Sequence, residues 1–118
     1  MQMGELSEIF FALADPTRRA LLGQLRQGEA TVTELAGPHS ISVPSVSRHL
    51  KVLEQAGLIT KSRSAQWRNC RLQPASLQKV EEWMRPYRDF LDARLDRLDA
   101  QLATTPDRPD EFPEPEDR

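Results

Sequence analysis

Hydroxyl-bearing and cationic side chains gather in residues 42–57, a stretch with the features of a helix. Ser42 can accept a hydrogen bond from a first-turn N–H, Pro44 suits that turn because it has no N–H to satisfy, and Gly57 can end the helix. At about 100° per residue, Val46, Leu50 and Leu53 form one apolar stripe that must be buried. The opposite face carries Pro44, Ser45, Ser47, Arg48, Lys51 and Gln55.

The polar face has groups that suit the DNA major groove. An arginine can donate two hydrogen bonds to a guanine edge, and a serine can donate to phosphates or bases. We therefore predict that this helix binds DNA through Ser42, Pro44, Ser45, Ser47, Arg48 and Lys51. An ordinary amphipathic surface helix is the alternative interpretation, because Arg and Lys are common on exposed faces.

The charge distribution favours a polyanionic partner, although the formal net charge of the whole chain is −2. Residues 42–73 carry six bases against the single acid Glu54, which gives a local charge of +5. Residues 104–118 carry six acids and two bases, a local charge of −4. Positive charge is therefore concentrated beside the candidate reading helix, as expected of a nucleic-acid-binding surface.

Length and composition indicate one globular domain. The 118 residues are 38% apolar and 29% charged, which suits one modest core. We expect residues 1–103 to fold and the acidic, proline-rich residues 104–118 to be a disordered tail. The start of the chain does not have the pattern of a signal peptide, and no apolar run approaches the roughly 20 residues of a membrane span. The chain has a single cysteine, which agrees with a reducing compartment. We therefore expect a cytoplasmic protein.

Two helices are predicted at the start of the chain. The first covers residues 3–14, and its apolar face is formed by Leu6, Ile9, Phe10 and Leu13. The second begins with the cap Asp15 and Pro16, ends at Gly28, and is expected to direct inward Ala20, Leu21, Leu22 and Leu25. Arg18 and Arg19 lie near its N-terminal end, which is unfavourable for cations unless phosphates lie nearby.

A third helix is predicted just before the reading helix. Residues 31–34 match the capping-box pattern, in which Thr31 and Glu34 satisfy each other's backbone donors, and Gly37–Pro38 ends the helix. Ile41, in the connection that follows, is expected to fill the core beneath the turn. The two helices then form a helix-turn-helix, whose second helix reads DNA.

A two-stranded hairpin is predicted after Gly57. Residues 58–61 and 67–72 are β-prone, and residues 62–66 form a polar loop between them. The loop carries Arg63 and Gln66 and is followed by Arg68. These groups could lie over a phosphate backbone, although a solvated hairpin tip is an equally good interpretation.

The last helix carries a long apolar stripe after Pro74, interrupted by Pro86, which should kink or divide it. A small domain has few other elements that could pack against such a stripe, so we predict that a second copy covers it in a two-fold homodimer. Its interface would include Leu6, Phe10, Tyr87, Leu91, Leu95, Leu98 and Leu102. Packing of the last helix on the first helix of the same chain is the alternative.

The chain resembles ArsR-type winged-helix transcriptional regulators over about residues 5–100. The resemblance is carried by the runs at residues 12–19, 33–36, 46–53 and 56–59, which read ALADPTRR, TELA, VSRHLKVL and AGLI. It implies a mainly α winged helix-turn-helix fold with a small β-hairpin as the wing. It also implies a bacterial homodimer paired through the first and last helices, which represses transcription at an inverted-repeat operator. His49 would join Ser45, Ser47 and Arg48 on the operator-reading helix.

The sequence departs from the metal-sensing members of that family. Their sensing thiolates would fall at Thr31 and Thr33, whose hydroxyls are poor ligands for soft metals. The last helix contains no histidine, and His39 and His49 have no third soft ligand at a recognisable spacing. We therefore expect the non-metal-sensing subgroup, often autoregulatory, with no cofactor and an effector that the sequence does not identify.

Two alternatives stay open beside this one. A winged helix can bind a protein instead of DNA, and Cys70 could make the regulator redox-responsive, because Arg68 and Arg71 would lower its pKa if it were exposed. An enzyme is not expected, because the chain has no Gly-rich phosphate loop, nucleophile elbow or coupled Ser/His/Asp spacing.

Overall fold

The computed structural model describes residues 4–64 and 67–104. The chain divides into two units, Met1–Trp83 and Met84–Arg118. The elements in chain order are α1 (Glu5–Leu13), α2 (Pro16–Leu25), β1 (Ala30–Thr31), α3 (Val32–Ala36), α4 (Val43–Gln55), β2 (Ile59–Ser64), β3 (Trp67–Leu72) and α5 (Pro74–Thr104). The division between the units falls inside α5.

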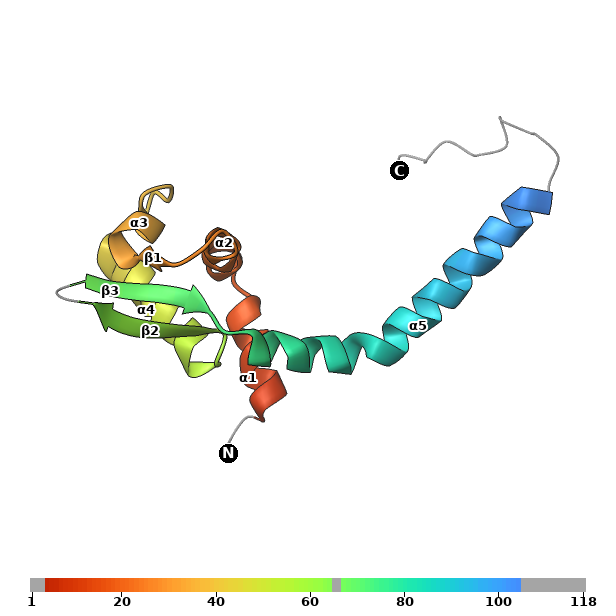
Figure 1. The fold of residues 1–118 in the computed structure, drawn as a ribbon, viewed down its shortest axis with the longest axis horizontal. Helices are drawn as coiled ribbons and strands as arrows, with labels where there is room; N and C mark the ends of the chain where they lie inside the picture. Colours follow the sequence, from red (N-terminus) through yellow and green to blue (C-terminus); the bar gives the residue numbers. More distant parts are fainter. Residues whose placement is uncertain (1–3, 65–66, 105–118) are drawn as a thin grey trace. The chain divides into compact units, whose positions relative to one another are not determined.

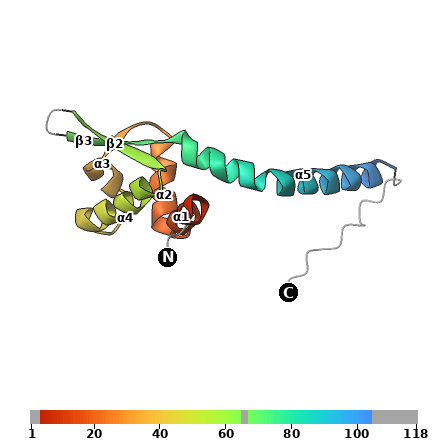
Figure 2. The same cartoon turned by 90° about the horizontal axis from the view of Figure 1, so that it is seen from below.

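One hydrophobic core holds the first unit together. Helices α1 to α4 lie along one side of the strands β2 and β3 (Figures 1 and 2). The core includes Ile9, Leu21, Leu25, Leu35, Val46, Leu50, Leu53, Leu58, Ile59 and Cys70. Because all three members of the α4 stripe are fully buried, the predicted orientation of this helix is confirmed.

The predicted starts of α2 and α3 are confirmed in atomic detail. The Asp15 side chain accepts a hydrogen bond from the Arg18 N–H at 3.0 Å. Thr31 and Glu34 form a complete capping box, with the Glu34 N–H donating to Thr31 Oγ1 and the Thr31 N–H donating to Glu34 Oε1. The sequence predicts these caps correctly because each cap depends on residues only three positions apart.

Two predicted core positions are wrong. Ala20 is exposed, because it lies about 200° around the helix axis from the buried Leu22. Ile41 is 37% exposed and does not fill the core beneath the turn. Leu35 and Ala36 of α3 are buried there, so the short helix supplies the apolar groups and the connection after it remains at the surface.

The sheet has one strand more than predicted. Its order is β1-β3-β2, with antiparallel pairing throughout. The two-residue strand β1 pairs Ala30 with Cys70. Strand β2 also runs to Ser64, so Arg63 lies in the strand opposite Arg68 and not in the loop. The polar residues in the second half of β2 hid this extension, because backbone pairing needs no apolar side chains.

The end of α4 is fixed by the first turn of α5. Gly57 adopts φ +76°, a conformation that favours glycine, and a Cβ added there would lie 2.6 Å from Ser76 Oγ. The buried Ser76 hydroxyl donates a 2.9 Å hydrogen bond to the Ala56 carbonyl. The C-terminal end of the candidate reading helix is therefore held by a directional contact.

Helix α5 contains Pro86 in its interior, so this proline does not divide it. Pro86 has no N–H to donate to the carbonyl one turn earlier. In the described part of the second unit, six large apolar side chains are each more than half exposed in the single chain: Tyr87, Phe90, Leu91, Leu95, Leu98 and Leu102. All of them except Phe90 belong to the predicted interface. The predicted tail lies outside the described residues except for Thr104. Within residues 4–64 and 67–104, none of the helices combines the length and the apolar content that a membrane crossing requires.

Candidate nucleic-acid interface

The outer face of α4 presents polar groups as predicted from the spacing. Ser42 caps the helix, because its hydroxyl accepts a hydrogen bond from the Ser45 N–H at 3.3 Å. Pro44, Arg48 and Lys51 are exposed, while Ser45 and Ser47 are half-buried. Pro44 and Arg48 lie in the first two turns, where a helix docked in a groove makes its base contacts, and Lys51 lies in the third turn.

Arg48 is held in place by its own helix. Its Nη2 donates a 3.0 Å hydrogen bond to Ser45 Oγ, one turn earlier. This contact uses one of the five N–H groups of the guanidinium and leaves the others for a partner. A side chain that is already ordered loses less conformational entropy when it binds.

A basic groove lies between α4 and the wing. It is lined by Val32, Ser47, Arg48, Lys51, Glu54, Lys61, Ser62, Arg63 and Arg68. Five of these side chains are cationic, and the single acid, Glu54, lies 3.5 Å from Lys61 Nζ. The groove therefore has the charge of a polyanion-binding surface.

The wing contributes cations from two neighbouring strands. Arg63 and Arg68 are directly opposite each other in the β2–β3 pair, and both are exposed. Like charges at such positions repel each other, so an anion between them would relieve the repulsion. Lys61 also lines the groove and was not predicted as a contact. It shares a face with Arg63 by the period-two alternation of a strand that reaches Ser64. Gln66, the other predicted wing contact, lies outside the described residues.

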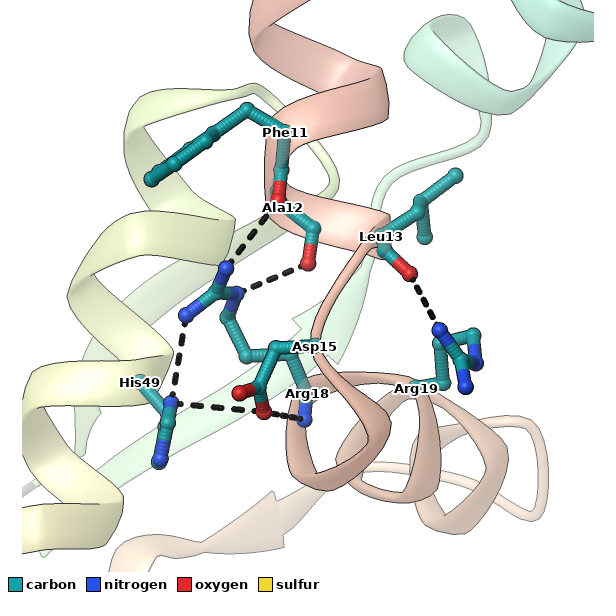
Figure 3. Close-up of polar contacts among 7 residues, drawn as sticks. All are labelled: Phe11, Ala12, Leu13, Asp15, Arg18, Arg19 and His49. Carbon is teal, nitrogen blue, oxygen red and sulfur yellow. Dashed lines mark hydrogen bonds and ion pairs between the residues drawn. The ribbon is translucent and has the colours of Figure 1, made fainter.

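Arg18 and Arg19 do not need a phosphate to explain their positions. Arg18 Nε and Nη2 donate to the carbonyls of Ala12 and Phe11, at 2.7 and 3.0 Å. Arg19 Nη1 donates to the Leu13 carbonyl at 2.8 Å (Figure 3). These two side chains cap the C-terminal end of α1, where backbone carbonyls lack the full set of helical N–H partners.

His49 lies on the side of α4 that faces α2. Its Nδ1 is 3.8 Å from Asp15 Oδ2 and 3.4 Å from Arg18 Nη1 (Figure 3). The Arg18 N–H lowers the pKa of the Asp15 carboxyl below its ordinary value, with smaller contributions from the neighbouring charges. Asp15 is therefore an anion when it contacts the histidine.

Cys70 lies in the core and not on the groove. Its side chain is fully buried, and this burial raises the pKa of the thiol, outweighing the opposite effect of Lys61. The condition under which Arg68 and Arg71 could activate it, exposure, is not met. The packing therefore favours the interpretation of Cys70 as a small apolar residue.

Thr31 and His39, two candidate metal ligands, make other contacts in the structure. Thr31 Oγ1 caps α3, and His39 Nε2 is 2.7 Å from Gln24 Oε1. In the part of the chain that the structure describes, no three His, Cys, Asp or Glu side chains are grouped so that they could hold a metal ion.

Comparisons with known proteins agree with the geometry. A family model described as a helix-turn-helix domain matches residues 13–62. The chain is 38% identical over 79 residues to the transcriptional repressor SdpR of Bacillus subtilis, covering 67% of this chain and 88% of that protein. It is 36% identical over 102 residues to the arsenic resistance transcriptional regulator ArsR1 of Pseudomonas putida, covering 86% of this chain and 80% of that protein.

A solved structure agrees as well. The crystal structure of a protein described as an ArsR family transcriptional regulator superposes with a TM-score of 0.68 at 38% identity, covering 78% of this chain and 97% of that one.

Proposed function

Since the chain belongs to the ArsR family of winged helix-turn-helix transcriptional regulators, we propose that it is a homodimeric repressor of an inverted-repeat operator. It is a DNA-binding regulator and not an enzyme. The single observation that carries the proposal is the basic groove, in which α4 and the wing bring Arg48, Lys51, Arg63 and Arg68 to one surface. The same cluster argues against a winged helix that binds a protein, because its charge suits a polyanion.

The dimer part of the proposal rests on apolar surface that one chain leaves uncovered. Within the first unit, the Phe10 and Trp83 rings pack edge to face at 5.5 Å, and Lys79 forms an ion pair with Glu5. The alternative of packing on the first helix of the same chain is therefore realised near the start of α5. Leu6 is half-buried and Phe10 is 38% exposed, while the stripe from Tyr87 to Leu102 is exposed. A second copy would bury this surface.

Selection from randomised duplex DNA, followed by sequencing, tests the function directly. We expect enrichment of an inverted repeat whose half-sites lie about 10 base pairs apart centre to centre, or a multiple of that, because two reading helices must enter grooves on one face of the duplex. Enrichment of a single half-site would contradict the dimer. A protein that selects no sequence at all would contradict DNA reading.

Arg63→Ala should weaken binding to all DNA sequences alike. We expect Arg63 to contact a phosphate, and the dimer carries two copies of it. Its loss should therefore reduce the salt dependence by about two units, one for each lost contact, from a wild-type slope of roughly −5, if about six phosphates are neutralised per dimer. Titrations at several salt concentrations measure the slope. Arg71→Ala is the matched control, because Arg71 is an exposed arginine of the neighbouring strand β3 that does not line the groove. Its Nη1 lies 4.0 Å from Glu29 Oε2. Equal slopes for the wild type and Arg63→Ala would contradict the assignment.

Zinc, cadmium and arsenite should not release the protein from DNA at concentrations near stoichiometric. The hydroxyl of Thr31 is engaged as a helix cap, and the single thiol is buried. Soft metals bind hydroxyls poorly. Because one relative is named for arsenic resistance, arsenite is the informative case. Release of the untagged protein by one metal but not by others would show that a sensing site exists.

A further inference from the structure

Arg18 connects three helices of the first unit through one planar group. Its Nε and Nη2 bind the last carbonyls of α1, and its Nη1 lies 3.4 Å from His49 Nδ1 on α4 (Figure 3). Its own backbone N–H donates to Asp15 at the start of α2. The guanidinium also lies over the Phe11 ring, 5.3 Å from the ring centre. Since the guanidinium is rigid, these contacts fix the point at which it meets α4.

The His49 ring is thereby placed between an anion and a cation. Its Nδ1 can donate to Asp15 or accept from Arg18, so either protonation state of this nitrogen has a partner. The histidine side chain is only 25% exposed. Its polar atom at Nδ1 is thus directed toward α2 and not outward with Arg48.

These contacts restrain the angle of α4 relative to the other helices, which the apolar core defines only weakly. The stripe of Val46, Leu50 and Leu53 buries one side of α4, but apolar packing is non-directional. Ser76 fixes only the C-terminal end of the helix. The contact at His49 adds a directional restraint at the middle of the helix, one residue from Arg48.

We propose that Asp15 and Arg18 hold His49 as a positioning residue, which sets the angle at which α4 presents Arg48 to DNA. His49 then acts through Arg48 and does not itself contact the operator, in contrast to the role that the family resemblance implied. This inference rests on the proposed DNA-binding function.

The choice of substitution at His49 separates the two roles. Asparagine places a polar atom near the position of Nδ1 and cannot reach that of Nε2, whereas glutamine places its amide near Nε2. We expect His49→Asn to keep operator affinity within about threefold of the wild type and His49→Gln to lose roughly tenfold, within the range measured for contacting pairs. The reverse order would show that Nε2 contacts DNA and would overturn the proposal.

Arg18 and Arg19 provide a matched pair for the second test. Both bind carbonyls at the end of α1, but only Arg18 reaches α4. Arg18→Lys keeps the positive charge but loses the planar guanidinium, whose several donors contact α1 and α4 at once. We therefore expect roughly tenfold weaker binding to the operator. Binding to unrelated DNA and the salt slope should be unchanged. Arg19→Lys should bind both DNAs as the wild type does. The double variant Arg18→Lys, His49→Gln should be no weaker than either single variant, because the two residues act as one unit.

The outcomes distinguish this inference from the proposed function. If the wild-type protein selects no DNA sequence, the function itself is wrong. If the wild type binds its operator and Arg18→Lys binds as Arg19→Lys does, the function stands and the positioning role is overturned. Melting temperatures of all variants identify any loss of binding that comes from unfolding.

Discussion

Arg48→Ala should lower operator affinity by about 1 to 3 kcal/mol per half-site, or about 5- to 150-fold for each half-site, because a bidentate contact to a base edge is lost. Arg48 is exposed in the first half of α4 and is already ordered by Ser45, so little rearrangement is needed for it to reach a base. The variant should also accept more than one base at a single position of each half-site. Repeating the selection from randomised DNA with the variant measures this relaxation.

Arg26→Ala is the control for Arg48→Ala. It removes an exposed arginine at the end of α2, outside the groove, and should leave both affinity and sequence preference unchanged. If Arg48→Ala kept the wild-type affinity and preference, α4 would not be the reading element. A uniform loss at all sequences would assign Arg48 to a phosphate instead of a base.

Leu98→Glu should break the dimer and with it the binding of the full operator. The side chain is 52% exposed in the single chain, and in a dimer interface a carboxylate in its place would be desolvated without a partner. Binding of two linked half-sites can exceed the affinity of one by about 10²- to 10⁴-fold, so loss of the linkage should cost a factor of this size. Leu91→Glu should act in the same way. Sedimentation reports the oligomeric state, and gel shifts report binding.

Ala93→Glu is the control for the leucine variants, because it adds the same charge to an exposed position about 200° around α5 from Leu91. It should sediment and bind as the wild type does. A Leu98→Glu protein that sediments as a monomer and yet binds the full operator undiminished would contradict the need for a dimer.

The elements that the sequence predicted well are those fixed by close neighbours in the chain. The caps Asp15, Thr31 and Ser42 each act on a residue three positions away, so their patterns are visible without a fold. The reading helix followed from its stripe and its caps together. The strand β1 was not predicted, because it is stabilised by pairing with a strand about 40 positions later.

The errors concern side chains whose partners lie in other elements. Arg18 and Arg19 look misplaced at the start of α2 until the end of α1 is seen beside them. No spacing rule connects Arg18 to His49, which is 31 positions away. Ile41 has an apolar side chain at a place where the core was already filled. Such contacts depend on the way the helices pack and are not encoded in a local pattern.

The burial of Cys70 makes the reactivity of its thiol a probe of transient opening of the wing. The thiol is the single one in the chain, and it lies on β3, the middle strand, where β1 and β2 both pair with it. A thiol reagent can react with it only in molecules whose sheet has transiently separated from the core. The rate of thiol labelling therefore reports how often the wing opens in the wild-type protein. A lower labelling rate in the presence of DNA would measure how strongly the bound operator stabilises the closed wing.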